Sequence, residues 1–351
     1  MKPNVSTLLL VALILSLSAG TPSFAADGLP EPWKKYLSPT EQTTLAELSA
    51  QEIEEPPQQP DDPQAMLKIM REGFEEFVAG IAPNLGSVKK EPFEEKGVRG
   101  LWMYPENAAE DRVLLYFHGG GYVVGSSATG AGIAGVLADE AGIAAFVLDY
   151  PLAPEFPYPA ALDNAVNAYR MLLEKYEPAH IVLAGDSAGG GLVLAVLLNI
   201  RDEGLPMPAS AYLLSPWTDL GVSFASHETK KDVDSVIERG FLENLASAYA
   251  GEENLKDPRI SPAFADLRGL PPLLVHVGSF ETLLDDALTI VRNAAIADVP
   301  VKFTVWPGYY HVFQMHSGRL EGARKALEDG AAFFRDTMDG TLLRPDSQVN
   351  K

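Results

Sequence analysis

The chain has 351 residues, no cysteine and a formal net charge of −21 at pH 7. So acidic a chain does not suit nucleic acid or an anionic membrane surface as a partner, because both would repel it. Disulfides are excluded. Since the chain has neither an H-E-x-x-H motif nor clustered His/Asp ligand spacing, we also expect no metal and no cofactor.

The first 25 residues have the layout of a secretory signal peptide. Met1-Lys2 gives a short positive start, Leu8–Leu17 is apolar, and Ser23-Phe24-Ala25 is a small-x-small cleavage site. The apolar stretch is shorter than the ~20 residues of a spanning helix, so a membrane anchor is the weaker alternative. We predict cleavage after Ala25, a secreted or periplasmic protein, and no membrane span in the mature chain.

Composition divides the rest of the chain into three parts. Residues 26–94 form a polar N-terminal segment, in which apolar residues recur at helical spacing over Pro63–Ile81 and form one face that packs on the core or joins a cap. Residues 95–336 alternate strand and helix signals, which is typical of a mainly parallel sheet with helices on both faces. Residues 337–351 are predicted to be a tail.

A first glycine-rich motif follows the apolar strand Val113–Phe117. His118 comes next, and then three consecutive glycines, Gly119, Gly120 and Gly121. Glycines let backbone N–H groups approach a ligand without a side chain in the way, as an oxyanion hole requires. A phosphate-binding loop is disfavoured because no G-x-G-x-x-G spacing or G-K-[ST] ending follows. We expect His118 to fix this loop rather than to act as a base.

The second glycine-rich motif is Gly185–Gly189, a G-x-S-x-G pattern. The apolar strand Ile181–Ala184 precedes it and the helix-like run Gly190–Ile200 follows. A serine on such a strand-to-helix turn has an exposed hydroxyl, and the N–H of the next residue begins a helix. We predict Ser187 as the nucleophile and the N–H of Ala188 as a further oxyanion donor.

Several motifs together resemble the hormone-sensitive-lipase-like branch of α/β-hydrolase esterases, over about residues 65–335. That resemblance implies an α/β-hydrolase fold with a helical cap, here an insertion at about residues 216–272, and an activity on small esters with short acyl chains. The motifs are HGGGY at 118–122, DYPLAPE at 149–155, GDSAGGG at 185–191, SPWTDL at 215–220 and GLPP at 269–272.

The base must follow Ser187 in the chain, because this fold uses the order serine, acid, histidine. Two of the six histidines precede Ser187, one lies in a polar loop and one lies inside an apolar strand. His311 follows the strand Val301–Trp306 and a turn, which is where a base belongs, and His316 is the weaker candidate. The histidines are His118, His180, His227, His276, His311 and His316.

The acid departs from the pattern of the related esterases, which have an aspartate at the first position of D-x-L-x-D. Here Glu281 fills that position, and Leu283 and Asp285 match the third and fifth. A glutamate can accept from the Nδ1–H of His311, so we predict Glu281 as the acid. Asp285 is the alternative acid, and otherwise a supporting residue that holds the loop near the serine.

Side chains beside these motifs are candidates for the substrate pocket, and packing in the core is the competing interpretation for the aromatic ones. The candidates are Tyr122, Asp186, Trp217, Phe280 and Tyr309.

The predicted function is therefore a serine carboxylesterase that acts on a small-molecule ester. A carbohydrate acetyl esterase and a lactonase would use the same three residues and remain alternatives. A non-catalytic ligand-binding protein on the same fold is disfavoured because serine, acid and histidine are all present. The sequence leaves the oligomeric state open, a homodimer being one option.

Overall fold

The computed structural model describes residues 34–49, 62–234 and 236–342. The predicted signal peptide, residues 1–25, lies outside the described residues, as do residues 343–351 of the predicted tail. Across the described ranges, no helix is both long enough and apolar enough to cross a membrane.

Within the described residues one sheet of eight strands runs in the order β1-β2-β4-β3-β5-β6-β7-β8. The β1–β2 and β2–β4 pairs are antiparallel and all other pairs are parallel, so the predicted mainly parallel sheet is confirmed. The strands are β1 (Lys89–Glu95), β2 (Val98–Tyr104), β3 (Ala109–Phe117), β4 (Ile143–Leu148), β5 (Ile181–Asp186), β6 (Ser210–Leu214), β7 (Leu273–Gly278) and β8 (Val301–Trp306).

The β1–β2 hairpin corrects the predicted start of the catalytic domain. Lys96 and Gly97 form its two-residue turn, both at positive φ, 52° and 78°, as a type I′ turn requires. The predicted boundary after residue 94 falls inside β1 and is wrong, because the sheet already begins at Lys89. Charged residues and Pro92 hide this strand from a hydrophobic pattern, since an edge strand tolerates both.

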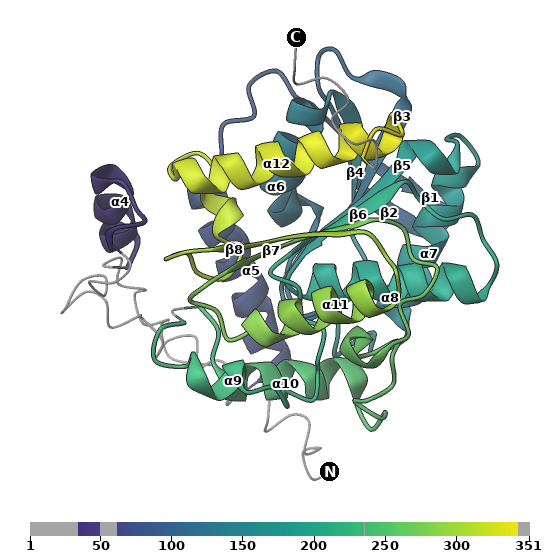
Figure 1. Ribbon diagram of the computed structural model, residues 1–351. Helices are drawn as coiled ribbons and strands as arrows, with labels where there is room; N and C mark the ends of the chain where they lie inside the picture. The colour runs from purple at the N-terminus through teal and green to yellow at the C-terminus, as the bar shows by residue number, and fades with distance from the viewer. Residues whose placement is uncertain (1–33, 50–61, 235, 343–351) are drawn as a thin grey trace.

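Helices cover both faces of the sheet, as the strand and helix alternation predicted (Figure 1). On one face lie α6 (Ser127–Ala141) and α12 (Glu321–Met338). On the other lie α7 (Ala160–Leu173), α8 (Ala188–Asp202) and α11 (Leu284–Ile296). Helix α12 ends at Met338 and so includes the first two residues of the predicted tail, 337–351.

Two hydrophobic cores lie on the two sides of the sheet. Along β3, Leu115 and Phe117 pack into the core under α7 and α8, while Leu114 and Tyr116 pack into the core under α6 and α12. All four side chains are fully buried. A strand that is buried on both faces appears in the sequence as a continuous apolar run, which explains why the strand before the first glycine motif was visible.

The chain between β6 and β7 forms the predicted insertion. It contains α9 (Ser226–Thr229), α10 (Arg239–Ala250) and the short helix η2 (Pro262–Phe264). The ring of Tyr249 on α10 stacks on Tyr122, with centroids 3.9 Å apart. The insertion therefore lies against the loop that follows β3. Two further short helices are η1 (Pro178–His180) and η3 (Phe313–His316).

Helix α5 (Pro63–Ile81) has the bounds that the apolar spacing predicted. Its Arg71 donates to the carbonyl oxygens of Val123 (2.9 Å) and Ala153 (3.1 Å) and pairs with Glu155 (2.8 Å). This N-terminal helix thus holds the end of the glycine-rich loop against the neighbouring loop.

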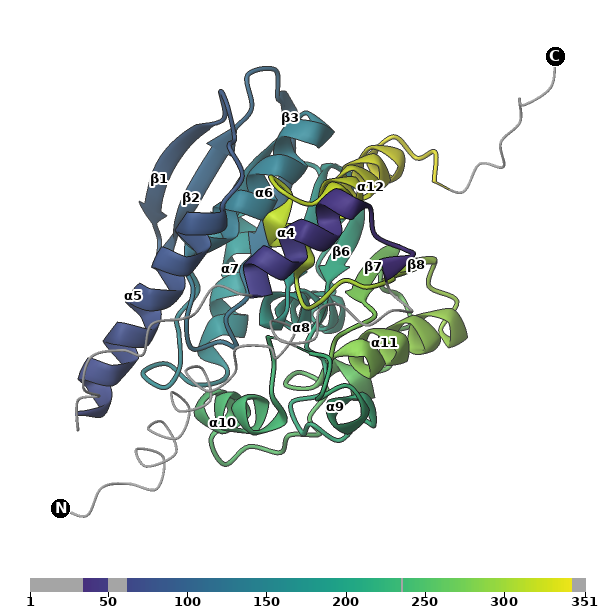
Figure 2. The same ribbon diagram turned by 90° about the vertical axis from the view of Figure 1, so that its left-hand side faces the viewer.

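Helix α4 (Pro39–Ser49) lies near α12 and the loop after β8 (Figure 2). Its buried Glu41 accepts a hydrogen bond from the Tyr309 hydroxyl and another, of 3.1 Å, from the N–H of Gly322. The described parts of the N-terminal segment therefore contact the loops that follow β3, β4 and β8, all at the carboxyl ends of these strands, and the start of α12.

Candidate active site

The turn between β5 and α8 carries Ser187 in a strained conformation. Its φ of 54° and ψ of −121° lie in a region that residues with a Cβ rarely adopt. The flanking glycines leave no room for a side chain: a Cβ on Gly185 would collide with the carbonyl of Gly189, and one on Gly189 with that of Phe117. The G-x-S-x-G pattern is therefore a packing requirement of this turn, and the turn has the shape of a nucleophile elbow.

The glycine-rich loop after β3 brings backbone N–H groups to the same edge of the sheet. Gly120 and Gly121 have positive φ, 109° and 61°. Among the described residues, no acceptor is found for the N–H groups of Gly120, Gly121 and Ala188. Gly119 differs, because it faces the carboxylate of Asp186, with which a Cβ would collide.

Asp186 joins the serine turn to the glycine-rich loop instead of lining a pocket. It is 8 % exposed, and its Oδ1 accepts a hydrogen bond of 2.6 Å from the Tyr116 hydroxyl. Burial raises the pKa of this carboxyl, against the lowering effect of the Tyr116 hydrogen bond. Its prediction as a pocket residue is thus corrected: it holds the Gly119 backbone next to Ser187.

His118 has the structural role that the sequence predicted. Its ring stacks on Tyr150, with centroids 4.2 Å apart, and its Nδ1 lies 2.7 Å from the Gly119 carbonyl oxygen. The Tyr150 hydroxyl donates to the His118 carbonyl at 2.7 Å. Burial lowers the pKa of His118 to about 4, so the ring is neutral near pH 7.

His311 and Glu281 meet at the carboxyl ends of two neighbouring parallel strands, β8 and β7. His311 Nδ1 lies 3.1 Å from Glu281 Oε2, and the two residues are 6 % and 0 % exposed. The other carboxylate oxygen, Oε1, accepts from Ser215 Oγ at 2.7 Å and from the N–H of Gly278. The carboxylate is thus held on both sides, with one oxygen turned to the imidazole.

Three carboxylates act on His311. Burial alone would lower its pKa, but the hydrogen bond and charge of Glu281, with the charges of Asp234 and Asp186, raise the pKa above the ordinary 6.5.

Comparison with known proteins identifies the family of the chain. Residues 114–315 match a family model described as an alpha/beta hydrolase fold. The chain is 43% identical over 235 residues to an acetyl-hydrolase of Streptomyces hygroscopicus, covering 67% of this chain and 78% of that protein. It is 35% identical over 255 residues to an esterase of Acinetobacter venetianus, covering 72% and 84%.

A solved structure decides the branch of the family. An esterase from the bacterial hormone-sensitive lipase family superposes with a TM-score of 0.75 at 38% identity, covering 78% of this chain and 92% of that one. The chain belongs to the hormone-sensitive-lipase family of α/β-hydrolase esterases. The predicted family, fold and ester-hydrolase class are thereby confirmed.

The raised pKa of His311 predicts the acid side of the pH profile of this esterase. A general base must be uncharged, so with His311 as the predicted base kcat/KM falls as the pH falls through the pKa of this histidine in the free enzyme. We expect a midpoint above pH 6.5, the ordinary value for histidine. Measuring kcat/KM at constant ionic strength from about pH 5 to 9 checks this. A midpoint at or below the ordinary value would contradict it.

The histidines that the sequence analysis did not choose as the base have other contacts in the esterase. His276 lies 2.8 Å from the Tyr212 hydroxyl, and burial lowers its pKa to about 3. His316 ends η3 and is buried, which lowers its pKa to about 4. Neither contacts Glu281 in the structure.

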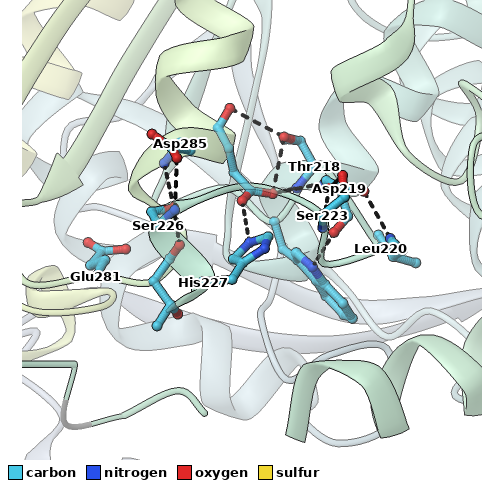
Figure 3. A network of polar contacts seen from close by, with 12 residues as sticks. Thr218, Asp219, Leu220, Ser223, Ser226, His227, Glu281 and Asp285 are labelled. Carbon is cyan, nitrogen blue, oxygen red and sulfur yellow. Dashed lines mark hydrogen bonds and ion pairs between the residues drawn. The ribbon is translucent and has the colours of Figure 1, made fainter. Parts of the chain in front are cut away.

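Asp285, the alternative acid, is hydrogen-bonded to Ser226 of the insertion. Its Oδ2 accepts from the N–H of Ser226 at 2.8 Å, and its own N–H donates to Ser226 Oγ at 3.0 Å (Figure 3). Ser226 also donates to the Thr282 carbonyl. Asp285 therefore fastens the start of α9 to α11. The supporting role that the sequence suggested applies to the insertion rather than to the serine turn.

A buried ion pair lies beside this contact. His227 Nε2 is 2.9 Å from Asp286 Oδ2, and both side chains are fully buried. Asp286 Oδ1 also accepts from the N–H groups of Thr218 and Asp219, both at 2.8 Å. Burial lowers the pKa of His227, but the hydrogen bond and charge of Asp286 outweigh it and the net pKa is raised. His227, predicted to lie in a lid or loop, is instead an anchor of the insertion.

Removal of the Asp286 carboxylate should destabilise the fold. In Asp286→Ala the imidazole of His227 and two backbone N–H groups lose their buried partner, so we expect the free energy of unfolding to fall by about 3–5 kcal/mol. Urea denaturation measures this. Asp266→Ala, which removes an exposed partner of Arg268, is the control and should leave the unfolding midpoint near that of the wild type. Equal midpoints for the two variants would contradict the expectation.

The aromatic pocket candidates pack in the core, which was the competing interpretation. Tyr309 donates to Glu41 on α4, and Trp217 Nε1 donates to the Asp219 carbonyl at 3.1 Å. The four side chains, none more than 4 % exposed, are Tyr122, Trp217, Phe280 and Tyr309.

Two residues near Glu281, the predicted acid, were missed from the sequence. Ser215 contacts Glu281, and Asp234 accepts from the N–H (2.7 Å) and hydroxyl (2.9 Å) of Thr282, the next residue. A signal existed for Ser215, because it follows β6, the strand between those that carry the serine and the acid. Asp234 comes from the insertion and had no such signal.

Proposed function

We propose that this esterase is a serine carboxylesterase for short-acyl esters, with Ser187 as nucleophile, His311 as base and Glu281 as the orienting acid. The observation that carries the proposal is the 3.1 Å contact between His311 Nδ1 and Glu281 Oε2. It lies at the same edge of the sheet as the strained turn of Ser187.

The proposed reaction has two halves. His311 takes the proton of the Ser187 hydroxyl, and the oxygen attacks the acyl carbon. The N–H groups of Gly120, Gly121 and Ala188 receive the negative charge of the tetrahedral intermediate, while Gly119 holds the loop. His311 then protonates the leaving alcohol, and water repeats the sequence on the acyl-enzyme. Glu281 stays ionised and keeps the imidazole in the required tautomer.

Side chains of the insertion favour the proposed preference for substrates with a short acyl chain. Leu245 of α10 lies against Gly121, where a Cβ would collide with its side chain, and Tyr249 stacks on Tyr122 beside it. Bulky buried side chains of the insertion therefore lie next to Gly121, one of the proposed oxyanion donors, and next to the residue that follows it. The relative named acetyl-hydrolase points to the same size of acyl group.

The proposed specificity is tested with p-nitrophenyl esters whose acyl chains run from two to twelve carbons. The purified chain should hydrolyse them with the highest kcat/KM at the short end, and Ser187→Ala should not. A maximum at long chains would refute the acyl preference. Equal rates for the two proteins would refute the serine mechanism.

A carbohydrate acetyl esterase is the second candidate, favoured by the name of the acetyl-hydrolase relative and by the predicted signal peptide. A lactonase would use the same residues. Acetylated oligosaccharides and small lactones, assayed beside p-nitrophenyl acetate, separate the three by their kcat/KM values.

We propose secretion to the periplasm or the medium, on the basis of the predicted cleavage after Ala25. N-terminal sequencing of the protein recovered from each cell fraction tests this. An intact start at Met1 in the cytoplasmic fraction would contradict the proposal.

A further inference from the structure

Ser215 lies between the two sides of the proposed catalytic site. It follows β6, whose neighbours are β5, which leads to Ser187, and β7, which leads to Glu281. Its side chain is fully buried and its φ is 46°, an uncommon value for a residue with a Cβ. The N–H of Ser215 donates to the His276 carbonyl at 2.8 Å, which ties its backbone to β7.

The hydroxyl of Ser215 makes two contacts with the proposed machinery. Oγ donates to Glu281 Oε1 at 2.7 Å and accepts from the N–H of Val312 at 3.1 Å. Val312 follows His311 directly and has a φ of 48°. One oxygen atom is therefore bonded both to the acid and to the backbone next to the base.

We infer that Ser215 is a positioning residue that sets the geometry of Glu281 against His311. A carboxylate can rotate about its terminal bond, and Ser215 with the Gly278 N–H fixes Oε1 so that Oε2 faces the imidazole. The same hydroxyl fixes the backbone of the histidine loop through Val312. Losing it frees both partners at once, and small misplacements of catalytic groups cost up to about 100-fold in rate.

The inference rests on the proposed function, and a serine at the other end of β6 gives a matched control. Ser210 begins β6 and therefore lies at the end of the strand opposite to Ser215. It is also fully buried, and its hydroxyl is 2.8 Å from the hydroxyl of Thr337. Ser215→Ala and Ser210→Ala each remove one buried hydroxyl from β6 or its end. Only the first touches the acid and the histidine loop.

Kinetics with p-nitrophenyl acetate form the first test. In Ser215→Ala we expect kcat to fall about 10- to 100-fold with KM within about twofold of the wild type, because orientation and not binding is lost. Ser210→Ala should keep the wild-type kcat. If Ser215→Ala does not fold, Ser215→Gly replaces it, because glycine accepts the positive φ without strain.

The proton NMR signal of the His311 Nδ1–H, which a bound carboxylate moves far downfield, is the second readout. It should shift or be lost by exchange in Ser215→Ala and remain in Ser210→Ala. A wild-type kcat and an unchanged signal in Ser215→Ala would overturn the inference. So would equal losses of kcat in both variants, or a higher KM with the signal intact. If the wild-type enzyme is no faster than Ser187→Ala, the proposed function itself fails, whatever Ser215 does.

Discussion

Replacing Ser187 with alanine lowers kcat by about a millionfold, the loss expected when a nucleophile that acts jointly with its base is removed. The remaining rate comes from binding and from the oxyanion donors. The fold should not change. Alanine keeps the Cβ that the turn already accommodates, and the Ser187 side chain does not cap α8. The measurement is kcat for p-nitrophenyl acetate, with the circular dichroism spectrum and the unfolding midpoint as checks of folding.

A Ser187→Ala protein that folds normally and retains a few per cent of the activity would contradict the assignment of the nucleophile. Contaminating host esterases limit this assay, so both proteins must be purified in parallel from the same host.

Glu281→Gln lowers kcat by about 10⁴-fold, as neutralising the orienting acid does in serine hydrolases. The amide no longer stabilises the charge that forms on His311. Its NH₂ group can also turn toward Nδ1 and favour the wrong tautomer. The shape of the side chain is kept, so the contacts of Oε1 with Ser215 and Gly278 change as little as a single substitution allows.

Asp285→Asn is the matched control for Glu281→Gln. It removes a carboxylate four residues away, on the next turn, that contacts Ser226 and not His311. We expect its kcat to stay within about threefold of the wild type, because only a contact of the insertion is weakened. Full activity in Glu281→Gln together with a large loss in Asp285→Asn would reverse the choice of acid.

The parts of the fold that could be predicted are those with a strong local pattern. The strand β8 has the predicted bounds, because it is a short run before a clear turn, and α5 follows from apolar residues at helical spacing. The hairpin strand β1 was missed because its stability comes from pairing with β2 at the sheet edge. A charged sequence with a proline gives no sign of such pairing.

In the candidate site, too, residues with a local sequence pattern could be predicted, and residues whose role depends on distant contacts could not. Ser187 and His311 could be proposed from the sequence because each comes just after a strand, Ser187 within a glycine-rich motif and His311 after the acid in chain order. Ser215 could not be given a role, because its effect depends on contacts with Glu281 and Val312, which are 66 and 97 residues away in the chain. Long-range hydrogen bonds of one hydroxyl have no signature in a single sequence.

The insertion shows the same limit. Asp286 and His227 form a fully buried pair across 59 residues, although Ser223–Asp234 is polar and resembles an exposed lid. The polarity of this stretch predicted a loop. The polar side chains instead satisfy one another, which is the usual condition for burying such groups.

Labelling with a fluorophosphonate tests the central claim most directly, because only an activated serine reacts quickly with this reagent. The mass of the intact protein should increase by one phosphonyl group, and peptide mapping should place that group on Ser187. Labelling should be slowed strongly in Glu281→Gln and absent in Ser187→Ala. A folded wild-type protein that is not labelled, or is labelled at another residue, would contradict the assignment of Ser187, His311 and Glu281 as a catalytic unit.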